Sequence, residues 1–384
     1  MRFVHISDNH LGFRQFGLFE RENDFYDVFD RAVEEIIKER PDFVIHSGDL
    51  FEASRPPTRA LLLVQRSFSR LKDENIPVYA IPGNHDTIMR KNTYPPQILY
   101  EMFGLKLISK KNPFYIHDGV FIGGSPYVSK YYSKSLKERI KFLEERSKDY
   151  GKRILVLHQA IDKYLPYEFE LKIGDLPRCF DYYALGHIHN RIIDDFGRGR
   201  LAYPGSTEIW RIDELKNYRK KGKGFYLVDL DGDLPDVQGV NLEMSRDVIE
   251  KNIEFSEFEE EIEKLKRSIE EMETMPMLYL TVKGDFERSF VHKKLIDALS
   301  NISLHIRVNY DLEDDIEGGE YYKSSEGSLS IKDMIKMYYG EEKKEYSTFA
   351  LSLFDLLSSN KIEDAKELTE KFYHIGKPRP SGRG

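Results

Sequence analysis

Apolar residues recur along roughly the first 235 positions of the chain with two different spacings. Short continuous apolar runs, typical of buried strands, occupy residues 3–6, 43–46, 78–81, 119–123, 154–157 and 182–185. Between these runs, apolar residues return every three or four positions, which predicts helices over residues 24–39, 58–71 and 136–148. Strands that alternate with helices indicate a layered α/β domain with a substantial sheet, which we place at residues 1–240.

A second alternation of strands and helices follows the first domain. The pattern predicts strands over residues 248–255, 277–282 and 304–308, and helices over residues 256–272 and 290–299. These elements predict a small α+β domain at residues 241–312.

The rest of the chain differs in composition from both predicted domains. Residues 313–328 are acidic and are expected to form a flexible linker. Helices are then predicted over residues 330–339, 347–360 and 363–372. We expect these helices to form an arm at residues 329–376 that docks into a groove of a partner, although packing against the second domain is the alternative. The tail at residues 377–384 is expected to be disordered.

Composition excludes several classes of protein. A single cysteine, Cys179, among 384 residues permits neither an internal disulfide nor a multi-thiolate zinc site. Neither a signal peptide nor an apolar run of about 18 residues is evident, so we expect a cytoplasmic protein without a membrane anchor. The net charge of -8 argues against non-specific wrapping of nucleic acid by the whole surface, but it permits a local basic patch.

Polar residues that can bind metals follow five of the predicted strands. The motifs are Asp8-Asn9-His10, Gly48-Asp49, Gly83-Asn84-His85-Asp86, His158, and Gly186-His187-Ile188-His189. Because the carboxyl ends of strands line the ligand crevice of open α/β sheets, these motifs are expected to converge. Aspartate, asparagine and histidine together are typical ligands of Mn, Fe or Zn, and this many ligands require two metals.

Each motif alone has an ordinary explanation, such as a turn, a cap or a buried histidine. His187 and His189 carry more information, because alternate positions of a strand face the same side and should aim both imidazoles together. The joint occurrence of all five motifs at strand ends favours a metal centre. His5 and His46 lie inside strands, and we expect them to support the site or the core rather than to bind metal.

This joint pattern resembles the calcineurin-like metallophosphoesterase superfamily. Within it, the chain is similar to the SbcD-type DNA double-strand-break repair nucleases, whose archaeal and eukaryotic members are called meiotic recombination eleven. Further motifs of the resemblance are Arg55-Pro56-Pro57, Asp175-Leu176-Pro177 and Tyr203-Pro204-Gly205-Ser206. The resemblance covers residues 1–230, and it implies a four-layer β-sandwich flanked by helices, followed by a capping domain and a helical arm.

The resemblance also implies roles for the polar residues. One metal would be held by Asp8, His10, Asp49 and His189, and the other by Asp49, Asn84, His158 and His187. The implied metals are two Mn²⁺ ions, with Mg²⁺, Fe²⁺ or Zn²⁺ as substitutes. His85 would contact the phosphate and help to protonate the leaving oxygen. Many members carry histidine where this chain has Glu52; an ionised carboxylate cannot donate to phosphate, so no catalytic role is carried over to it.

The implied function is that of a manganese-dependent nuclease that processes DNA ends, as a 3'-5' exonuclease and as an endonuclease on single strands and hairpins. A group of basic residues in the loops after the strands is expected to contact DNA phosphates: Arg14, Arg55, Arg59, Arg90 and Lys91. Two alternatives remain open. One is a hydrolase of small phosphoesters or cyclic nucleotides, and the other is a metal-bound scaffold that tethers DNA.

Two protein partners are also implied. Apolar residues on the helix at 58–71 and in the segment 98–103 exceed what one helix face needs, which is consistent with the homodimer common in this family. The arm at residues 329–376 would bind a coiled-coil ABC-type ATPase of the SbcC class. The expected location is the cytoplasm, in association with the nucleoid.

Overall fold

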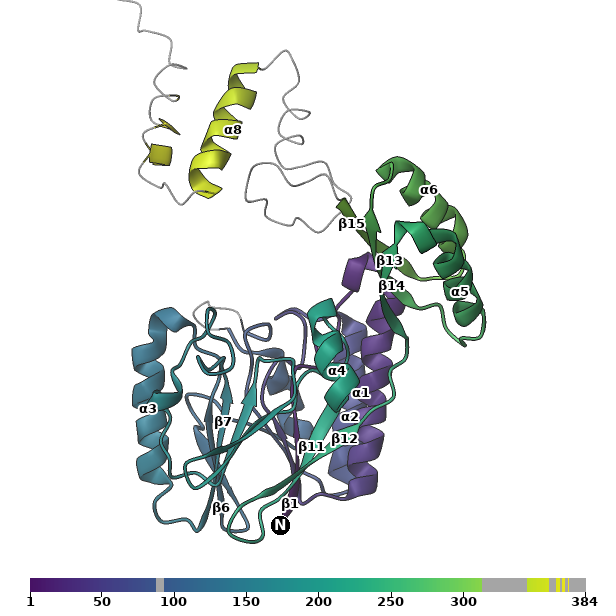
Figure 1. Ribbon diagram of the computed structural model, residues 1–384. Helices are drawn as coiled ribbons and strands as arrows, with labels where there is room; N and C mark the ends of the chain where they lie inside the picture. Colours follow the sequence, from purple (N-terminus) through teal and green to yellow (C-terminus); the bar gives the residue numbers. More distant parts are fainter. Residues whose placement is uncertain (88–92, 313–343, 359–363, 367, 370–371, 373–384) are drawn as a thin grey trace, which may run out of the picture. The chain divides into compact units, whose positions relative to one another are not determined.

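The computed structural model describes residues 1–87, 93–312, 344–358, 364–366, 368–369 and 372 (Figure 1). The chain divides into two compact units, Met1–Asp247 and Val248–Gly384. Several sequence predictions lie outside the described residues: Arg90 and Lys91, the linker at 313–328, the helix at 330–339 and the tail at 377–384.

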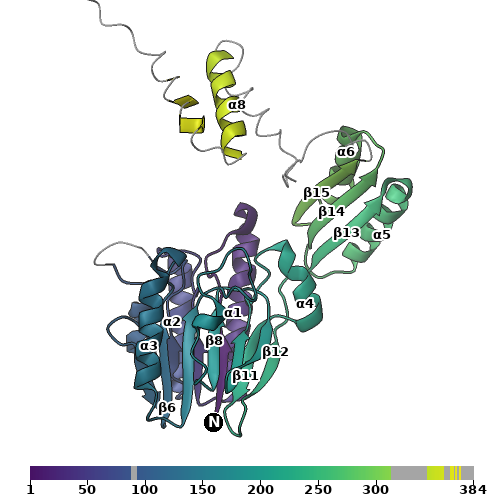
Figure 2. The ribbon, with the colours of Figure 1, turned by 60° about the vertical axis from the view of Figure 1, so that its left-hand side comes forward.

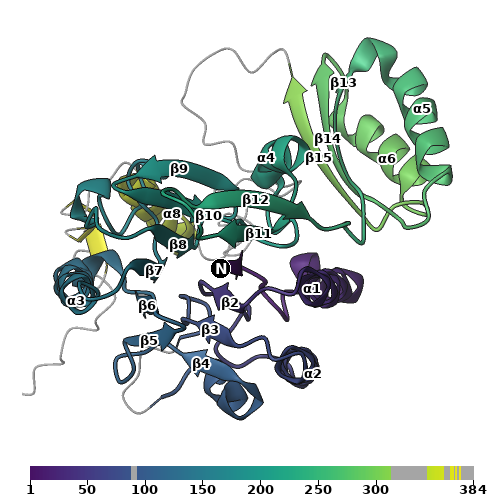
Figure 3. The same cartoon turned by 90° about the horizontal axis from the view of Figure 1, so that it is seen from below.

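Two six-stranded sheets form the middle of the first unit (Figure 3). The first sheet has the order β12 (Asp236–Asn241), β11 (Gly224–Asp229), β1 (Arg2–Ile6), β2 (Phe43–His46), β3 (Val78–Ala80) and β4 (Leu105–Leu107). The second has the order β5 (Phe114–His117), β6 (Val120–Ser125), β7 (Lys152–His158), β8 (Tyr182–Gly186), β10 (Gly199–Tyr203) and β9 (Ile192–Phe196). Strands β1 to β4 are parallel, and so are β6, β7, β8 and β10.

The two sheets pack face to face because their central strands are apolar on both faces. In β1, Phe3 belongs to the core between the sheets, whereas Val4 and Ile6 belong to the core beneath the helices. This alternation is the two-residue period of a strand. Phe43 stacks on Phe3 from the neighbouring strand β2, with ring centroids 5.0 Å apart.

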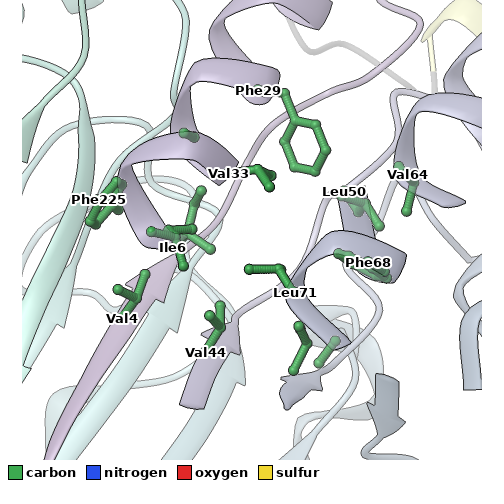
Figure 4. Close-up of a cluster of buried hydrophobic side chains, with 14 of the residues drawn as sticks. Val4, Ile6, Phe29, Val33, Val44, Leu50, Val64, Phe68, Leu71 and Phe225 are labelled. Carbon is green, nitrogen blue, oxygen red and sulfur yellow. The ribbon is translucent and has the colours of Figure 1, made fainter. Parts of the chain in front are cut away.

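Helices cover the outer face of each sheet. On the first sheet lie α1 (Phe19–Glu39) and α2 (Thr58–Asp73), over the apolar cluster drawn in Figure 4. On the second lies α3 (Ser133–Arg146). Shorter helices connect these elements: η1 (Gln15–Gly17), η2 (Pro96–Phe103), η3 (Lys130–Tyr132), η4 (Ile173–Asp175), η5 (Ile212–Glu214) and α4 (Leu215–Lys221). The layers run helix, sheet, sheet, helix, and the four-layer sandwich is confirmed.

The element boundaries differ from the sequence predictions at several helix ends. Helix α1 begins at Phe19, five residues before the predicted start, and α3 begins at Ser133, three residues early. The end of α1 follows the prediction, because Arg40 adopts a left-handed conformation immediately before Pro41. Six strands were missed: β4, β5, β9, β10, β11 and β12.

The second unit contains a three-stranded parallel sheet with two helices on one face (Figure 2). Its elements are β13 (Val248–Glu254), η6 (Phe255–Glu257), α5 (Phe258–Glu270), β14 (Met277–Gly284), α6 (Arg288–Leu299) and β15 (His305–Leu312). Apolar residues of both helices pack on the sheet in a core of their own. Helix α8 (Lys344–Ser358) falls on the predicted helix at 347–360 and begins three residues earlier. Among the described residues, no helix is both long and apolar enough to cross a membrane.

Candidate metal centre

The loops after β1, β2, β3, β7 and β8 meet at one end of the two sheets. Hydrogen bonds join loops of different sheets: His158 Nδ1 donates to the carbonyl oxygen of Ser47 at 2.7 Å, and the His187 amide donates to Asp8 Oδ1 at 3.1 Å. The parallel arrangement of the strands therefore brings their carboxyl ends, and the polar residues that follow them, into one crevice.

Asp8, His10 and His189 form one cluster of possible ligands in this crevice. Their nearest ligand atoms all lie within 4.8 Å of one another. The Nε2 atoms of His10 and His189 are only 3.1 Å apart, and His189 Nε2 lies 4.0 Å from Asp8 Oδ1. Nitrogen lone pairs that face each other so closely need a proton or a cation between them.

Asp49, His158 and His187 form the second cluster, with ligand atoms again within 4.8 Å of one another. His158 Nε2 lies 3.1 Å from Asp49 Oδ2 and 3.0 Å from Asn84 Oδ1. Asp49 Oδ2 also lies 4.0 Å from His10 Nε2. The carboxylate of Asp49 therefore stands between the two clusters, where it can serve both.

The two histidines that follow β8 both reach the crevice, but they belong to different ligand clusters, as the resemblance implied. Strand β8 ends at Gly186, and His187 has a left-handed backbone with φ of 88°. His187 consequently joins the cluster of Asp49, whereas His189 joins that of Asp8. The two-residue period of a strand no longer holds once the strand has ended.

Left-handed backbone conformations are concentrated at these ligand positions. The φ angles are 53° at Asp8, 48° at His10, 53° at Asp49 and 88° at His187. Such conformations are uncommon for residues other than glycine, and they persist where the surroundings hold them. Here the amides of Asp8 and His10 donate to the carbonyl oxygens of Gly48 and Asp49, at 3.0 and 3.1 Å.

Hydrogen bonds behind three imidazoles fix their tautomers. The Nδ1 atom of His158 donates to the Ser47 carbonyl at 2.7 Å, that of His10 to Glu52 Oε2 at 2.9 Å, and that of His189 to Glu214 Oε1 at 2.9 Å. Each bond uses the Nδ1 proton and leaves the Nε2 lone pair directed into the crevice, as a metal ligand requires.

Burial and charge together set the protonation of the crevice. Burial lowers the pKa of His187 to about 4, so this imidazole is neutral. Burial also lowers the pKa of His158, but the nearby carboxylate of Asp49 outweighs burial and raises it to about 9. The same pair keeps the pKa of Asp49 well below its usual range, even though burial raises it. A divalent cation that binds here would displace the proton of His158.

The donor set fits two divalent cations. The seven residues that the sequence suggested as ligands are brought together, as two clusters of nitrogen and oxygen donors plus the amide oxygen of Asn84. Imidazole and carboxylate donors suit Mn, Fe or Zn, and ordered outer hydrogen bonds are a regular feature of such sites. We conclude that these residues could bind a pair of metals.

His85 lies at the edge of the crevice. Its amide donates to Asp49 Oδ1 at 2.9 Å, and its Nδ1 donates to the backbone oxygen of Glu52 at 2.9 Å. Its ring packs edge-on against His10, with centroids 4.8 Å apart. Since Nδ1 is engaged with a carbonyl, Nε2 is the atom available to exchange a proton with a substrate.

His5 and His46 are fully enclosed beneath the site. Burial lowers the pKa of His5 to about 3 and that of His46 to about 4, so both are neutral. His5 lies 2.9 Å from Ser47 Oγ, and His46 Nε2 donates to Asn9 Oδ1 at 2.7 Å. Both histidines brace the loops that carry the ligands.

The basic residues suggested for DNA contact differ in their surroundings. Arg14 pairs with Glu22 at 2.6 Å, and Arg59 hydrogen-bonds to Asn23. Both guanidinium groups lie 5.5 Å from the ring centroid of Phe19, so they form one basic spot on α1 and its neighbours. Arg55 is exposed.

Sequence reasoning missed the residues that support the ligands. Asp86 accepts hydrogen bonds from the amides of Gly83, Leu50 and Phe51, at 2.9, 3.2 and 2.9 Å, and so ties the loop after β3 to the loop after β2. Buried Lys223 donates to Glu214 Oε2 at 2.5 Å. The sequence indicated Asp86 only weakly, because this residue belongs to one of the ligand motifs. It offered no indication of Lys223, which directly precedes the unpredicted strand β11.

Comparisons with known proteins agree with this arrangement. The model of the calcineurin-like phosphoesterase family matches residues 1–191. A protein of Methanocaldococcus jannaschii called DNA double-strand break repair protein Mre11 is 37% identical over 387 residues, which covers 97% of this chain and 99% of that protein. Proteins of the same name are 35% identical in Methanococcus maripaludis (94% of this chain, 96% of that protein) and 36% identical in Saccharolobus solfataricus (81% and 82%).

The close approach at Gly83 gives a test of the site. A Cβ atom at this position would lie 2.1 Å from Asp49 Oδ1 and 2.5 Å from the Asp49 amide nitrogen. We expect Gly83→Ala to displace Asp49 and to abolish most of the rise in melting temperature that Mn²⁺ causes in the wild type, since a ligand stabilises only the state that binds it. Gly151→Ala is the matched control, because its Cβ would meet nothing within 4 Å. An equal Mn²⁺ effect in both variants, measured by calorimetry, would contradict the assignment of Asp49.

Proposed function

The chain belongs to the Mre11 family of DNA double-strand break repair proteins, within the calcineurin-like phosphoesterases, and we propose that it is a two-metal nuclease that cleaves DNA. The observation that carries this proposal is the pair of ligand clusters with Asp49 between them. In this proposal the protein acts on DNA ends as a 3'-5' exonuclease and on single strands and hairpins as an endonuclease.

The proposed ligands are divided between the metals as the clusters suggest. Asp8, His10, Asp49 and His189 hold one Mn²⁺, and Asp49, Asn84, His158 and His187 hold the other. When bound, such a pair of cations lowers the pKa of a water molecule and neutralises charge on the phosphate. The buried histidines and carboxylates then keep the ligand geometry fixed, so no reorganisation is needed during the reaction.

His85 is proposed as the general acid. Its Nδ1 is fixed by the Glu52 carbonyl and its ring by contact with His10, while about a quarter of the side chain remains exposed. A proton on Nε2 can therefore be transferred to the oxygen that leaves the phosphorus. The oxygen of a water molecule would bond to phosphorus as the bond between phosphorus and the 3' or 5' oxygen breaks, and the leaving oxygen would take this proton.

DNA is the proposed substrate rather than a small phosphoester. The relatives that match along most of the chain are called DNA double-strand break repair proteins. Exposed Arg55 and the spot formed by Arg59 and Arg14 offer positive charge for phosphates beyond the one that is cleaved, although Glu22 offsets part of the charge of Arg14. The same expectation extends to Arg90 and Lys91, which lie outside the described residues.

His85→Gln tests the proposed reaction. We expect this variant to cleave labelled single-stranded and hairpin DNA about 10²–10⁴-fold more slowly than the wild type in single-turnover reactions with Mn²⁺, because the general acid is lost. Mn²⁺ binding, measured by calorimetry, should be retained. The matched control is His292→Gln, an exposed histidine of the second unit.

Three outcomes would contradict parts of the proposal. Equal cleavage rates in His85→Gln and the wild type would remove His85 from the mechanism. Rapid hydrolysis of bis(p-nitrophenyl) phosphate by the wild type, without cleavage of any DNA substrate, would favour a small-phosphoester hydrolase. DNA end-bridging without any cleavage would favour a tethering scaffold.

A homodimer is proposed from an exposed apolar surface on α2 and η2. These helices contact each other, since Tyr100 donates to the Leu61 carbonyl at 3.0 Å. Leu62, Leu99 and Met102 are 47%, 55% and 70% exposed on them. Large apolar side chains gathered on neighbouring elements are typical of an interface.

Charges placed in this surface should separate the proposed dimer. We expect sedimentation analysis to give a dimer for the wild type and a monomer for the double variant Leu99→Glu/Met102→Glu, because ionised carboxylates cannot be buried unpaired. Tyr167→Glu is the control, since Tyr167 is also exposed but lies between β7 and β8. A wild-type monomer, or a dimer that survives the double substitution, would contradict this interface.

The remaining parts of the chain are proposed to be a capping domain at 241–312, after the nuclease domain at 1–240, and a partner-binding arm at 329–376. The proposed partner of the arm is a coiled-coil ABC-type ATPase of the SbcC class. In the described part of the arm, Phe349 of α8 stacks on Phe372, with ring centroids 4.0 Å apart, and Tyr346 also contacts that ring. Aromatic packing thus joins α8 to Phe372, and a helical arm of this kind could dock in a groove as one unit.

Removal of residues 328–384 tests the arm. All proposed metal ligands belong to the unit Met1–Asp247, so the shortened chain should retain Mn²⁺-dependent cleavage. It should no longer form a complex with the ATPase in size-exclusion chromatography. A complex that persists after the deletion would contradict the assignment of the arm.

A further inference from the structure

The two imidazoles of the cluster that contains Asp8 are each held by a carboxylate. His10 Nδ1 donates to Glu52 Oε2, and His189 Nδ1 donates to Glu214 Oε1, both at 2.9 Å. Hydrogen bonds to an ionised acceptor are stronger than those to a neutral one. A carboxylate at Nδ1 also makes the opposite nitrogen a better electron-pair donor.

The imidazoles of the other cluster lack this support among the described residues. His158 Nδ1 donates to a backbone carbonyl, that of Ser47. Next to the His187 imidazole, Glu170 Oε1 lies 3.9 Å from Nε2, beyond hydrogen-bond distance. The two clusters therefore have different outer shells, although their ligand types are alike.

Trp210 connects the two carboxylates of the first cluster. Its indole Nε1 donates to Glu52 Oε2, and its backbone amide donates to Glu214 Oε2, both at 3.3 Å. Its ring stacks on His10 at 5.4 Å and meets His189 edge-on at 5.2 Å. A single residue thus fixes both the imidazoles and the carboxylates behind them.

We propose that Glu52 and Glu214 are paired positioning residues for His10 and His189, and that they make the metal site shared with Asp8 the tighter of the two. This inference rests on the proposed two-metal function. It gives a role to Glu52, to which the resemblance carried over no catalytic role because many members of that family carry histidine at this position. A neutral histidine would offer His10 a single uncharged acceptor, whereas Glu52 supplies a charged one that also accepts from Trp210.

Glu214 is held in its ionised form by a buried lysine. Lys223 Nζ lies 2.5 Å from Glu214 Oε2, and it also donates to Ser206 Oγ. Ser206 Oγ in turn lies 3.0 Å from Glu214 Oε2. Since removal of one partner would leave the other charge buried and unpaired, Glu214 is a poor first choice for mutation. Glu52 is partly exposed, and we therefore choose Glu52 for the test.

The test is a calorimetric titration of the full chain with Mn²⁺. The wild type should show a tighter and a weaker binding step. Glu52→Ala should weaken the tighter step by about 10–100-fold, the usual effect of losing an outer-shell partner, and should leave the weaker step unchanged. Glu52→Gln, which keeps an uncharged acceptor, should lose less. Glu170→Gln is the matched control and should leave the tighter step as in the wild type.

Trp210 supplies a second readout that does not depend on activity. It is the single tryptophan of the chain, and its ring contacts His10 and His189. Its emission should therefore change mainly during the tighter step, and in Glu52→Ala this change should move to higher Mn²⁺ concentration. The melting temperature of the metal-free protein shows whether the variant is folded.

The possible failures are distinguishable. Absence of Mn²⁺ binding in the wild type would contradict the proposed function itself. Two wild-type steps that are unchanged in Glu52→Ala, or equally weakened, would overturn the positioning role alone. A fluorescence change that follows the weaker step, or a Glu170→Gln variant that weakens the tighter step as much as Glu52→Ala, would overturn the assignment of that step to the Asp8 cluster.

Discussion

The structure of the first unit depends on one electrostatic constraint, which is that electron-pair donors must be held facing one another. The Nε2 atoms of His10 and His189 lie 3.1 Å apart, and Asp8 Oδ1 and Asp49 Oδ2 lie 4.0 Å from His189 Nε2 and His10 Nε2. Side chains in water would turn away from such an arrangement. Here they are buried at the ends of two packed sheets, and hydrogen bonds behind them fix the direction of each lone pair.

Part of the free-energy cost of this arrangement is strain in the backbone. Four ligand positions adopt left-handed conformations, each of which costs on the order of 1–3 kcal/mol. Bonds between loops hold them in place: Asp86 accepts from three backbone amides, and the loop after β1 pairs with the loop after β2. Close packing leaves no space for a side chain at Gly83 or Gly186, where an added Cβ would lie 2.1 and 2.2 Å from its neighbours. Backbone strain and tight packing therefore occur together in the loops that position the ligands.

The sequence predicted the residues whose position follows from a strand, and it failed where position depends on packing between distant segments. Asp8 and Asp49 were identified because each closely follows a short, mostly apolar run that is typical of a buried strand. The spacing of His187 and His189 did not show that they serve different clusters, which only the resemblance implied, because their placement depends on strand β8 ending at Gly186. Strands such as β9 and β12 carry polar residues and little apolar periodicity, so they were missed. Glu214 and Lys223 reach the site only through tertiary packing, which leaves no local signal in the sequence.

The negative net charge of the chain has a different interpretation once the candidate metal site is considered. A net charge of -8 argued against non-specific wrapping of nucleic acid by the whole surface. Yet Asp8, Asp49 and Glu214 are gathered in and behind one crevice, where Lys223 offsets only part of their charge. Bound cations are the largest local charges in any such site and reverse the sign of the field that a phosphate meets. In the proposed two-metal site, the carboxylates that repel a polyanion without metal would therefore be the groups that attract it through the cations they hold.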